Sequence, residues 1–393
     1  MERVAIVASV RTPIGKFLGS FAELSAADLG AAATGGLLER AGVAPGDVDE
    51  VIYGCARQAG GGPNMARQVL IRSGIPQERP AFTVNQACGS GLQAILLGAE
   101  RIRSNRARVV VAGGAESMTR VPYLLDRARM GYRLGNAPLA DGMYRDGFLD
   151  PICGLLMGET AEKLADLYKI PREEQDAYAL ESQRRAGAAI REGRFKSEIV
   201  PVTVPGRKGE SRAVTEDEHP RPDTTLADIK KLPPVFREGG TVHAGNSSGI
   251  TDGASSILLV AESVARERGL KPQAWVGESA VVGVDPSIMG IGPVPATREL
   301  LGRTGRTLDA YELIELNEAF AAQVLACDRD LKLDRARLNV NGGAIALGHP
   351  IGATGARIVT TLVHEMERRG ASLGLATLCV SGGLGIALEL SRN

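Results

Sequence analysis

The chain has few of the residues on which several kinds of site depend. Its 393 residues include five cysteines, four histidines and one tryptophan, and aromatic residues make up only 4%. No C-x-x-C pair occurs, so we expect neither a structural zinc site nor any other metal. The odd number and wide scatter of the cysteines are unlike a disulfide framework and favour a reduced, cytoplasmic protein. No apolar run approaches the roughly 18–20 residues of a membrane span.

The chain also lacks an excess of either charge. Lys plus Arg and Asp plus Glu number 46 each, so the net charge is zero. Proteins that bind nucleic acid or an anionic membrane surface commonly carry a basic excess, and we expect neither partner. A chain of this length exceeds one comfortable core, which predicts two or three domains. Glycine is abundant at 49 residues, and its richest stretches are the most informative parts of the sequence.

Alternating strand and helix patterns occur in two parts of the chain and predict a layered α/β fold. The first part covers residues 1–118 and 250–270, and the second covers residues 271–393. Each part has a Gly-rich helix start that is followed by a buried strand and a Gly-Gly pair. We interpret this repeat as a duplicated α/β unit, although the two halves differ too much in sequence to prove it.

Hydrophobic periodicity predicts the individual elements. In the first part, a buried strand over 109–112 ends at Gly113-Gly114. In the second part, a strand over 311–316 leads into a helix that begins at Asn317. The other predicted strands are 4–10, 48–54, 82–85, 373–379 and 384–390, and the predicted helices are 27–41, 91–104, 160–168, 172–192 and 352–369.

Residues 119–249 interrupt this pattern. They are dense in Arg and Asp, contain frequent Pro and Gly, and have helices that stand apart from any sheet. An insertion of this length usually has a function, and covering a binding site is a common one. Its last segment, 241–249, consists mostly of small residues. That segment fits either the lining of a narrow tunnel or a plain domain connector.

Cys88 lies in the run NQACGSG, just before a predicted helix. Free N–H groups and the helix dipole at such a position lower the pKa of a thiol and favour the reactive thiolate. The neighbouring glycines let a substrate approach the backbone. A buried structural cysteine fits the same residues equally well.

His349 ends the glycine-rich run NGGAIALGH, ahead of a proline and another helix. Within reach of Cys88, its imidazole would act as a base for the thiol and polarise a bound carbonyl. A lone loop histidine more often has no role. The surrounding glycines and the nearby Asn339 and Asn341 favour the functional reading.

Cys379 stands at the end of a buried strand, before a turn formed by Ser381 and Gly382. Backbone N–H groups of such a turn can form an oxyanion hole, and a second thiol near Cys88 could remove a proton from carbon. A core cysteine is the alternative. Asn317 is either a helix N-cap or an amide that holds a water molecule next to His349.

Taken together, these stretches resemble the thiolase family essentially from end to end. The resemblance implies a duplicated α/β/α/β/α layered fold with an inserted loop domain at 119–249, and an enzyme that makes or cleaves carbon–carbon bonds in thioesters of coenzyme A. It rests on six runs in the family's order, at 85–94, 157–162, 245–253, 315–320, 341–355 and 378–385.

The resemblance implies a role for each reactive residue. Cys88 attacks the thioester and carries the acyl group, and His349 activates it. Cys379 deprotonates the methyl carbon of acetyl-CoA during condensation, or protonates the leaving enolate during thiolysis. Asn317 orders a water that forms one oxyanion hole with His349. The N–H groups of Cys88 and Ser381 form the other, where charge develops on the thioester oxygen.

The resemblance also implies the substrates and the assembly. The insertion binds coenzyme A, with Arg221 near the nucleotide end and Ser248 near the pantetheine arm, while Leu156 and Met157 contact the substrate. Coenzyme A, acetyl-CoA and acyl-CoA are then substrates, and no bound cofactor is needed. The family forms homodimers, often paired into homotetramers.

Three positions depart from the family's usual pattern. Ser381 replaces a glycine, and a positive φ at that position would cost a serine on the order of 1 kcal/mol. Leu156 stands where acetoacetyl-CoA thiolases often have histidine, which leaves room for longer or ketoadipyl chains. Pro233 stands where arginine is usual, and nothing in the sequence explains it.

Two other functions fit parts of the sequence. A decarboxylating 3-ketoacyl synthase would share the fold, but such enzymes typically lack a second reactive cysteine and have another His or Asn set. The presence of Cys379 and Asn317 favours the thiolase reading. A non-catalytic acyl-CoA or lipid-binding relative would lose the nucleophile or the base, and this chain keeps both.

Overall fold

The computed structural model describes residues 2–206 and 210–392. Residues 1, 207–209 and 393 belong to the predicted domain ranges but lie outside the described residues. The main sheet contains the strands β1 (Val4–Arg11), β2 (Gly15–Lys16), β3 (Glu50–Gly54), β4 (Ala81–Val84), β5 (Val109–Ser117), β10 (Thr251–Ala261), β11 (Ala274–Gly283), β12 (Leu313–Leu316), β13 (Leu373–Val380) and β14 (Leu384–Ser391).

The main sheet consists of two halves with the same pairing pattern. In the first half, β1 pairs antiparallel with β10, β10 antiparallel with β5, and β5 parallel with β3. In the second half, β11, β14, β13 and β12 repeat these three pairings in the same order. The halves meet where Ala5 and Ile6 of β1 pair with Trp275 and Ala274 of β11. This repeat confirms the duplicated α/β fold.

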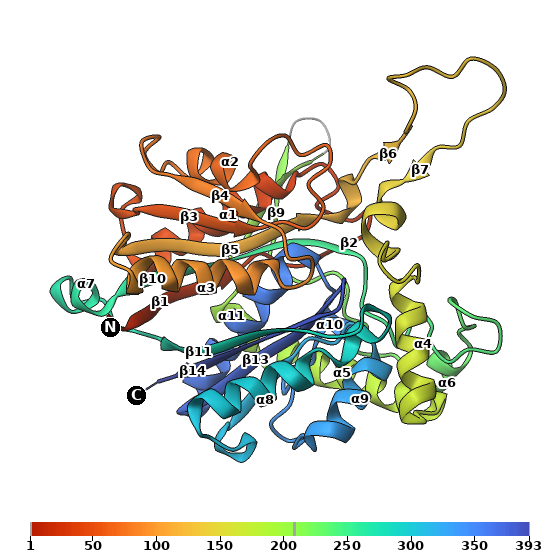
Figure 1. Ribbon diagram of the computed structural model, residues 1–393. Coiled ribbons are helices and arrows are strands. Elements are labelled where there is room, and N and C mark those ends of the chain that lie inside the picture. Colours follow the sequence, from red (N-terminus) through yellow and green to blue (C-terminus); the bar gives the residue numbers. More distant parts are fainter. Residues whose placement is uncertain (1, 207–209, 393) are drawn as a thin grey trace.

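Helices lie between the two halves and on their outer faces (Figure 1). The central helices α3 and α11 approach closely because glycines face each other across them. A Cβ added to Gly91 would lie 2.8 Å from the backbone nitrogen of Ala356, so a larger residue would push the helices apart. The helices of the two halves are α1 (Ala26–Ala41), α2 (Met65–Arg72), α3 (Ser90–Arg103), α7 (Glu262–Glu267), α8 (Pro293–Thr304), α9 (Ala321–Leu331), α10 (Ala344–Leu347) and α11 (Ile351–Arg369).

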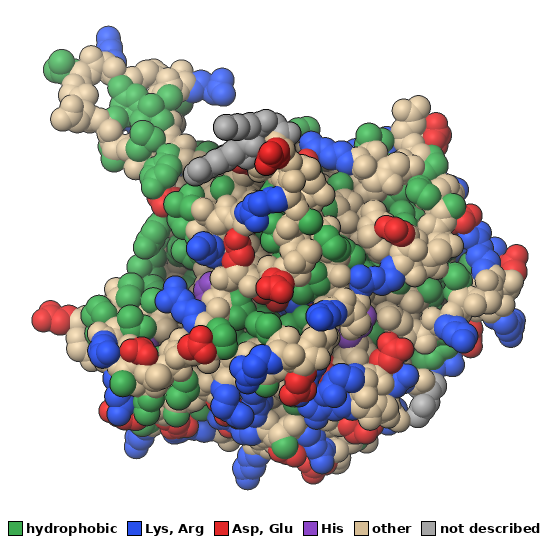
Figure 2. Space-filling view, turned by 180° about the vertical axis from the view of Figure 1, so that it is seen from behind, with side chains coloured by type: hydrophobic (Ala, Val, Ile, Leu, Met, Phe, Trp, Pro, Cys, Tyr) green, Lys and Arg blue, Asp and Glu red, His purple; other side chains and the backbone are tan. Residues whose placement is uncertain are grey.

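The insertion forms helices and two small hairpins over one end of the sheet. Its arm between β6 and β7 projects from the body, and hydrophobic side chains gather along it (Figures 1 and 2). The buried guanidinium of Arg11 on β1 ties the insertion to the sheet through ion pairs with Glu198 and Asp217. The elements are α4 (Met157–Tyr168), α5 (Arg172–Arg191), α6 (Leu226–Lys230), β6 (Tyr123–Leu124), β7 (Ala140–Asp141), β8 (Val202–Pro205) and β9 (Ser211–Val214).

Several predicted boundaries were wrong, and two of them have a clear physical reason. The strand β5 continues through Gly113-Gly114 to Ser117, because β10 pairs alongside it along that whole length. Glycine is needed at 114 because a side chain there would collide with the backbone of Gly352. The helix α9 begins at Ala321 rather than Asn317, so four residues of irregular chain follow β12. None of the described helices is long and apolar enough to cross a membrane.

Candidate active site

A cavity of about 540 Å³, here called the catalytic cavity, brings together most of the predicted site residues. Three reactive side chains from distant parts of the sequence reach it: Cys88 before α3, His349 before α11 and Cys379 on β13. The predicted residues Ser381, Leu156, Met157, Arg221 and Ser248 also line it. Asn317 and Gly382 do not belong to its lining.

Cys88 lies at a strained turn just before α3. Ala87 has a φ of 45°, which costs a non-glycine residue about 1–3 kcal/mol. The Ser90 hydroxyl holds the turn by accepting from the Gln86 N–H at 2.8 Å and donating to the Ala87 carbonyl at 2.7 Å. The turn therefore holds the sulfur of Cys88 against the cavity wall.

Burial raises the pKa of the Cys88 thiol above its ordinary value. The positive charge of Arg57 and hydrogen bonds from the backbone N–H groups of Ser381 and Cys88 oppose that shift without cancelling it. The predicted lowering of this pKa was wrong for the free protein, because desolvation outweighs the helix N-terminus and the nearby cation. The two N–H groups that reach the sulfur are those predicted to form an oxyanion hole.

His349 is buried and held in one orientation. Its Nδ1 lies 2.6 Å from the Thr354 hydroxyl, which donates its own proton to the Pro350 carbonyl at 2.9 Å. The hydroxyl therefore accepts from Nδ1–H, which leaves Nε2 as an unprotonated acceptor. Nε2 has no hydrogen-bond partner within the described part of the chain. Burial and the charges of Arg357 and Arg57 lower the pKa of His349 to about 3, so the imidazole is neutral.

Sequence reasoning gave no role to Thr354. Its signal was its position four residues after Pro350 in the first turn of α11, where a threonine hydroxyl can bond back to a carbonyl.

Cys379 is 1% exposed and faces the same cavity as Cys88. Burial raises the pKa of its thiol well above the usual value, and the charge of Cys88 raises it further. Cys379 is therefore protonated. No disulfide joins the two, because all five cysteines are free.

Asn317 is also 1% exposed, and both polar atoms of its side chain lack a partner among the described residues. Because α9 begins four residues later, the N-cap reading of Asn317 was wrong. A buried amide without a protein partner is typical of a group that serves water or a ligand. Its role at the reacting oxygen stays a prediction.

The neighbouring Glu318 holds the loop after β12 in place. Its carboxylate accepts hydrogen bonds from Tyr178 at 2.8 Å and Ser182 at 2.7 Å, both on α5, and from Asn339 at 3.1 Å. The backbone N–H of Ile345 donates to it at 3.2 Å. Glu318 thus ties the insertion to the loops that carry Asn317 and His349, a role that sequence reasoning missed.

The turn after β13 differs from expectation at two positions. Ser381 does not have a positive φ, whereas Gly382 and Gly383 do, at 85° and 81°. Serine at position 381 therefore carries no cost in backbone strain, because that cost would have required a positive φ. The N–H of Gly382 donates to the buried carboxylate of Asp150 at 2.9 Å. This bond overturns the assignment of Gly382 to an oxyanion hole, because its donor is already used.

The segment 241–249 lines the catalytic cavity through Ala244, Gly245 and residues 247–249, which favours the tunnel reading over the connector. Arg221 is exposed, and its backbone N–H donates to Gln183 at 2.8 Å. Ser248 is held by a bond from its N–H to the Ala319 carbonyl at 3.0 Å. The contacts of Arg221 and Ser248 with coenzyme A stay a prediction.

Beside Cys379 the wall is apolar. Gly158 allows the ring of Phe236 to lie directly against α4, and this ring meets Phe320 edge-on with 6.2 Å between centroids. Leu156 and Met157, at the start of α4, extend the same wall. The part of a ligand next to the two cysteines therefore meets mostly hydrocarbon.

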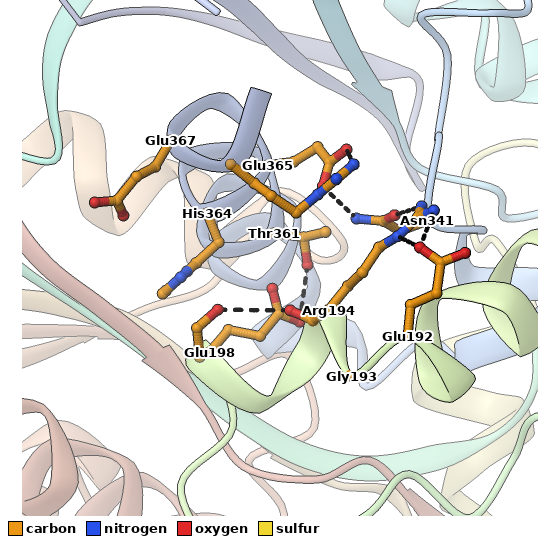
Figure 3. Close-up of a pocket in the computed structure, with 11 residues that line it drawn as sticks. Glu192, Gly193, Arg194, Glu198, Asn341, Thr361, His364, Glu365 and Glu367 are labelled. Carbon is orange, nitrogen blue, oxygen red and sulfur yellow. Dashed lines mark hydrogen bonds and ion pairs between the residues drawn. The ribbon is translucent and has the colours of Figure 1, made fainter. Parts of the chain in front are cut away.

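A second cavity of about 390 Å³, here called the polar cavity, lies between α11 and the segment that follows α5 (Figure 3). Its side chains bond to one another: Arg194 to Glu192 and Asn341, and Asn341 to Glu365. Thr361 bonds to Glu198 in the same way. Because these groups are mutually paired, the polar cavity presents no activated side chain.

Comparison with known proteins agrees with this geometry. Residues 4–263 match the family described as "Thiolase, N-terminal domain", and residues 270–392 match "Thiolase, C-terminal domain". An acetyl-CoA acetyltransferase of Pseudomonas aeruginosa is 53% identical over 393 residues and the full length of both chains.

Two solved structures superimpose on the whole chain. The acetyl-CoA acetyltransferase of Bacillus anthracis has a TM-score of 0.97 at 44% identity, and 99% of its chain is covered. Human mitochondrial 3-ketoacyl-CoA thiolase in complex with CoA has a TM-score of 0.96 at 44% identity, and 98% of its chain is covered. The order of the elements, the cavity with its two cysteines and histidine, and these full-length matches agree: the chain belongs to the thiolase family.

Proposed function

We propose that this thiolase is an acyl-CoA acetyltransferase that works through an acyl-Cys88 intermediate. In one direction it condenses acetyl-CoA with an acyl-CoA, and in the other it cleaves a 3-ketoacyl-CoA with coenzyme A. The observation that carries the proposal is the neutral His349 in the same cavity as two thiols, with a free lone pair on Nε2. Coenzyme A is a substrate.

In thiolysis, His349 takes the proton of Cys88 and the sulfur attacks the C3 carbonyl of the substrate. The N–H groups of Cys88 and Ser381 stabilise the negative charge on that oxygen. The C2–C3 bond then breaks, and its electron pair forms the enolate of acetyl-CoA. Cys379 gives its proton to C2 while His349 and a water held by Asn317 stabilise the enolate oxygen. The Cys379 thiolate then takes the proton of the coenzyme A thiol, whose sulfur attacks the acyl-enzyme. The shortened acyl-CoA leaves, and His349 returns its proton to Cys88.

The pKa directions fit this division of work. Because the pKa of Cys379 is raised, its thiol holds a proton that an enolate can take. Because the pKa of His349 is about 3, the imidazole accepts a proton only when charge develops beside it. Substrate binding must therefore promote the transfer from Cys88, since burial keeps that thiol protonated in the free enzyme.

The second thiol separates this function from a decarboxylating synthase, in which loss of CO2 forms the enolate and no side chain has to move a proton at C2. A non-catalytic binding protein would have no use for the strained turn at Ala87 or for an imidazole oriented by Thr354. We therefore favour catalysis over both alternatives.

We also propose that the chain forms a homodimer or homotetramer. The arm between β6 and β7 supports this, because Met130 is 74% and Leu134 99% exposed, and exposed apolar groups of this kind commonly mark a contact surface. Light scattering in solution checks the mass. The free cysteines favour a reducing compartment, and we place the protein in the cytoplasm.

Cleavage of acetoacetyl-CoA and of a long-chain 3-ketoacyl-CoA in the presence of coenzyme A tests the proposed function. Faster cleavage of acetoacetyl-CoA would indicate a biosynthetic type, in which Leu156 does not set chain length. Faster cleavage of the long substrate would indicate a degradative enzyme. If wild type cleaved no 3-ketoacyl-CoA, the proposal would be wrong.

A further inference from the structure

An arginine without an anionic partner lies in the wall of the catalytic cavity. Arg57 follows β3, and its backbone is fixed by Glu116, whose carboxylate accepts from the N–H groups of Ala56 and Arg57, both at 3.0 Å. The same carboxylate accepts from the Gly352 N–H at 2.8 Å, three residues after His349. Glu116 therefore places Arg57 beside the segment that carries the catalytic base.

The guanidinium of Arg57 lies flat against Gly147, in the short helical segment Tyr144–Phe148. A Cβ at Gly147 would lie 2.7 Å from Nη2 and 2.8 Å from Cζ, so only a glycine admits the guanidinium at this place. Arg57, Gly147 and Phe148 all line the catalytic cavity with Cys88. The charge is close enough to the reacting groups to oppose the rise that burial causes in the pKa of Cys88 and to add to the fall that burial causes in the pKa of His349.

Among the described residues, the side chain of Arg57 makes no ion pair, and its buried Nε has no hydrogen-bond acceptor. The nearby Glu116 is already used by backbone N–H groups. By contrast, the buried Arg11 binds two carboxylates. An arginine carries five donors in a planar fork that matches a carboxylate, and burying one without a partner is costly. The position therefore suits an anion that arrives with the substrate.

The surroundings of Arg57 indicate which part of the substrate carries that anion. Arg221, predicted to meet the nucleotide end of coenzyme A, is exposed and lies on a segment held to Gln183 of α5. Arg57 instead lies against Gly147, and both residues line the same cavity as the nucleophilic sulfur of Cys88. Arg57 and Cys88 line one cavity, so an acyl chain on the sulfur shares that cavity with this cation.

We propose that Arg57 binds a carboxylate at the far end of the acyl chain, so that the enzyme accepts 3-ketoacyl-CoA substrates that carry a second carboxyl group. The inference rests on the proposed thiolase function and specifies its substrate class. Cys88 attacks C3, the C2–C3 bond breaks, and C2 leaves as acetyl-CoA after it takes the proton of Cys379. The acyl-enzyme keeps the terminal carboxylate, and the thiol of coenzyme A releases it as a carboxyacyl-CoA.

Matched substrates test the assignment. We would measure kcat/KM for CoA-dependent cleavage of 3-ketoadipyl-CoA and of 3-ketohexanoyl-CoA, which have equal chain length but end in carboxylate and methyl groups. Wild type should prefer the carboxylate-ended substrate, and this first result needs no variant. Arg57→Gln should lower the ratio of the two kcat/KM values about 30-fold, as expected for a lost charge-assisted hydrogen bond. Arg57→Lys should retain part of the preference.

Arg106→Gln provides the control, because Arg106 is exposed beyond the far end of α3, roughly 20 Å from the turn at Cys88. It should leave the ratio unchanged. An equal fall on both substrates in Arg57→Gln would overturn the assignment and show that the cation acts on Cys88 alone. Wild-type preference for the methyl-ended substrate would also overturn it, while cleavage of acetoacetyl-CoA would still support the proposed thiolase function.

Discussion

Two cavities of this protein are lined by polar side chains in opposite states. In the polar cavity, Arg194, Asn341 and Glu365 bond to one another (Figure 3), and no buried atom of that lining lacks a partner among the described residues. In the catalytic cavity, Nε2 of His349 and Nε of Arg57 have none. Burying such groups is costly unless a ligand completes their hydrogen bonds. The paired side chains of the polar cavity therefore stabilise the fold, whereas the unpaired groups of the catalytic cavity are available to a substrate.

Replacing the nucleophile should have the largest effect. Cys88→Ala removes the atom that forms the acyl-enzyme, and we expect kcat/KM for acetoacetyl-CoA cleavage to fall at least about 10⁴-fold. Steady-state kinetics of the purified variant measure this. Cys327→Ala is the control, because Cys327 is buried outside the catalytic cavity and donates only to the Gly290 carbonyl. An equal loss of activity in both variants would show that replacing any buried cysteine inactivates the enzyme, whether or not the cysteine lines the catalytic cavity.

The second largest effect on kcat should come from replacing the histidine of the catalytic cavity rather than that of the polar cavity. His349→Ala removes the base and one donor to the enolate oxygen, which we expect to cost about 10²–10⁴-fold in kcat. His364→Gln changes a histidine of the polar cavity that contacts the Ser9 carbonyl, and its kcat should stay within about twofold. The same assay on both variants checks the comparison. A large loss in His364→Gln would contradict the view that the polar cavity is structural.

A threonine in each cavity provides a finer contrast. Thr354→Val removes the acceptor of the His349 Nδ1 proton, so the ring can rotate away from its productive orientation. We expect kcat to fall about tenfold. Thr354→Ser keeps the hydroxyl and should restore most of the rate. Thr361→Val, in the polar cavity, removes a bond to Glu198 and should leave kcat unchanged. If Thr354→Ser were as slow as Thr354→Val, the methyl group rather than the hydroxyl would orient the ring.

Removing a charge from the polar cavity should lower the stability of the fold and leave kcat unchanged. Burial by itself would raise the pKa of Glu365. The hydrogen bonds with Arg368, Asn341 and Arg369 together have the larger, opposite effect, so the pKa lies below the ordinary 4.5. Glu365→Gln should therefore lower the free energy of unfolding by about 1–3 kcal/mol at pH 7, with kcat unchanged. Urea titration of both proteins measures the difference.

The pH dependence of that difference has a definite sign. A carboxylate whose pKa is lowered in the folded state stabilises the fold above its unfolded pKa, and this contribution is lost as pH falls through the lowered value. The gap between wild type and Glu365→Gln should therefore be full at pH 7 and shrink below about pH 4.5. A gap that stayed constant down to pH 3 would show that the charge of Glu365 does not stabilise the protein.

Local pattern predicted the elements well where one periodicity continued over the whole segment. The predicted helices 91–104 and 352–369 correspond to α3 and α11 within one residue at each end, because a buried stripe every three to four residues defines each of them. The pattern gave a wrong result at Gly113-Gly114, where it predicted the end of a strand that in fact continues to Ser117. Gly114 is there because α11 packs against β5 at Gly352, and Gly113 because the backbone of Ser255 on β10 lies against it, contacts that sequence spacing does not reveal.

The sequence by itself identified the residues to which we assign the chemistry. Cys88, His349 and Cys379 lie in glycine-rich junctions that can be recognised without coordinates, because close approach to backbone requires small residues. Their convergence on one cavity needed the fold.

Only the tertiary structure decided the state of each group. Thr354 orients the imidazole, Asp150 occupies the N–H of Gly382, and Arg57 is left without an anion. Burial, and not the helix end, sets the direction of the Cys88 pKa. Desolvation and hydrogen bonding depend on neighbours from distant segments, and these neighbours are fixed by how the two halves and the insertion pack together.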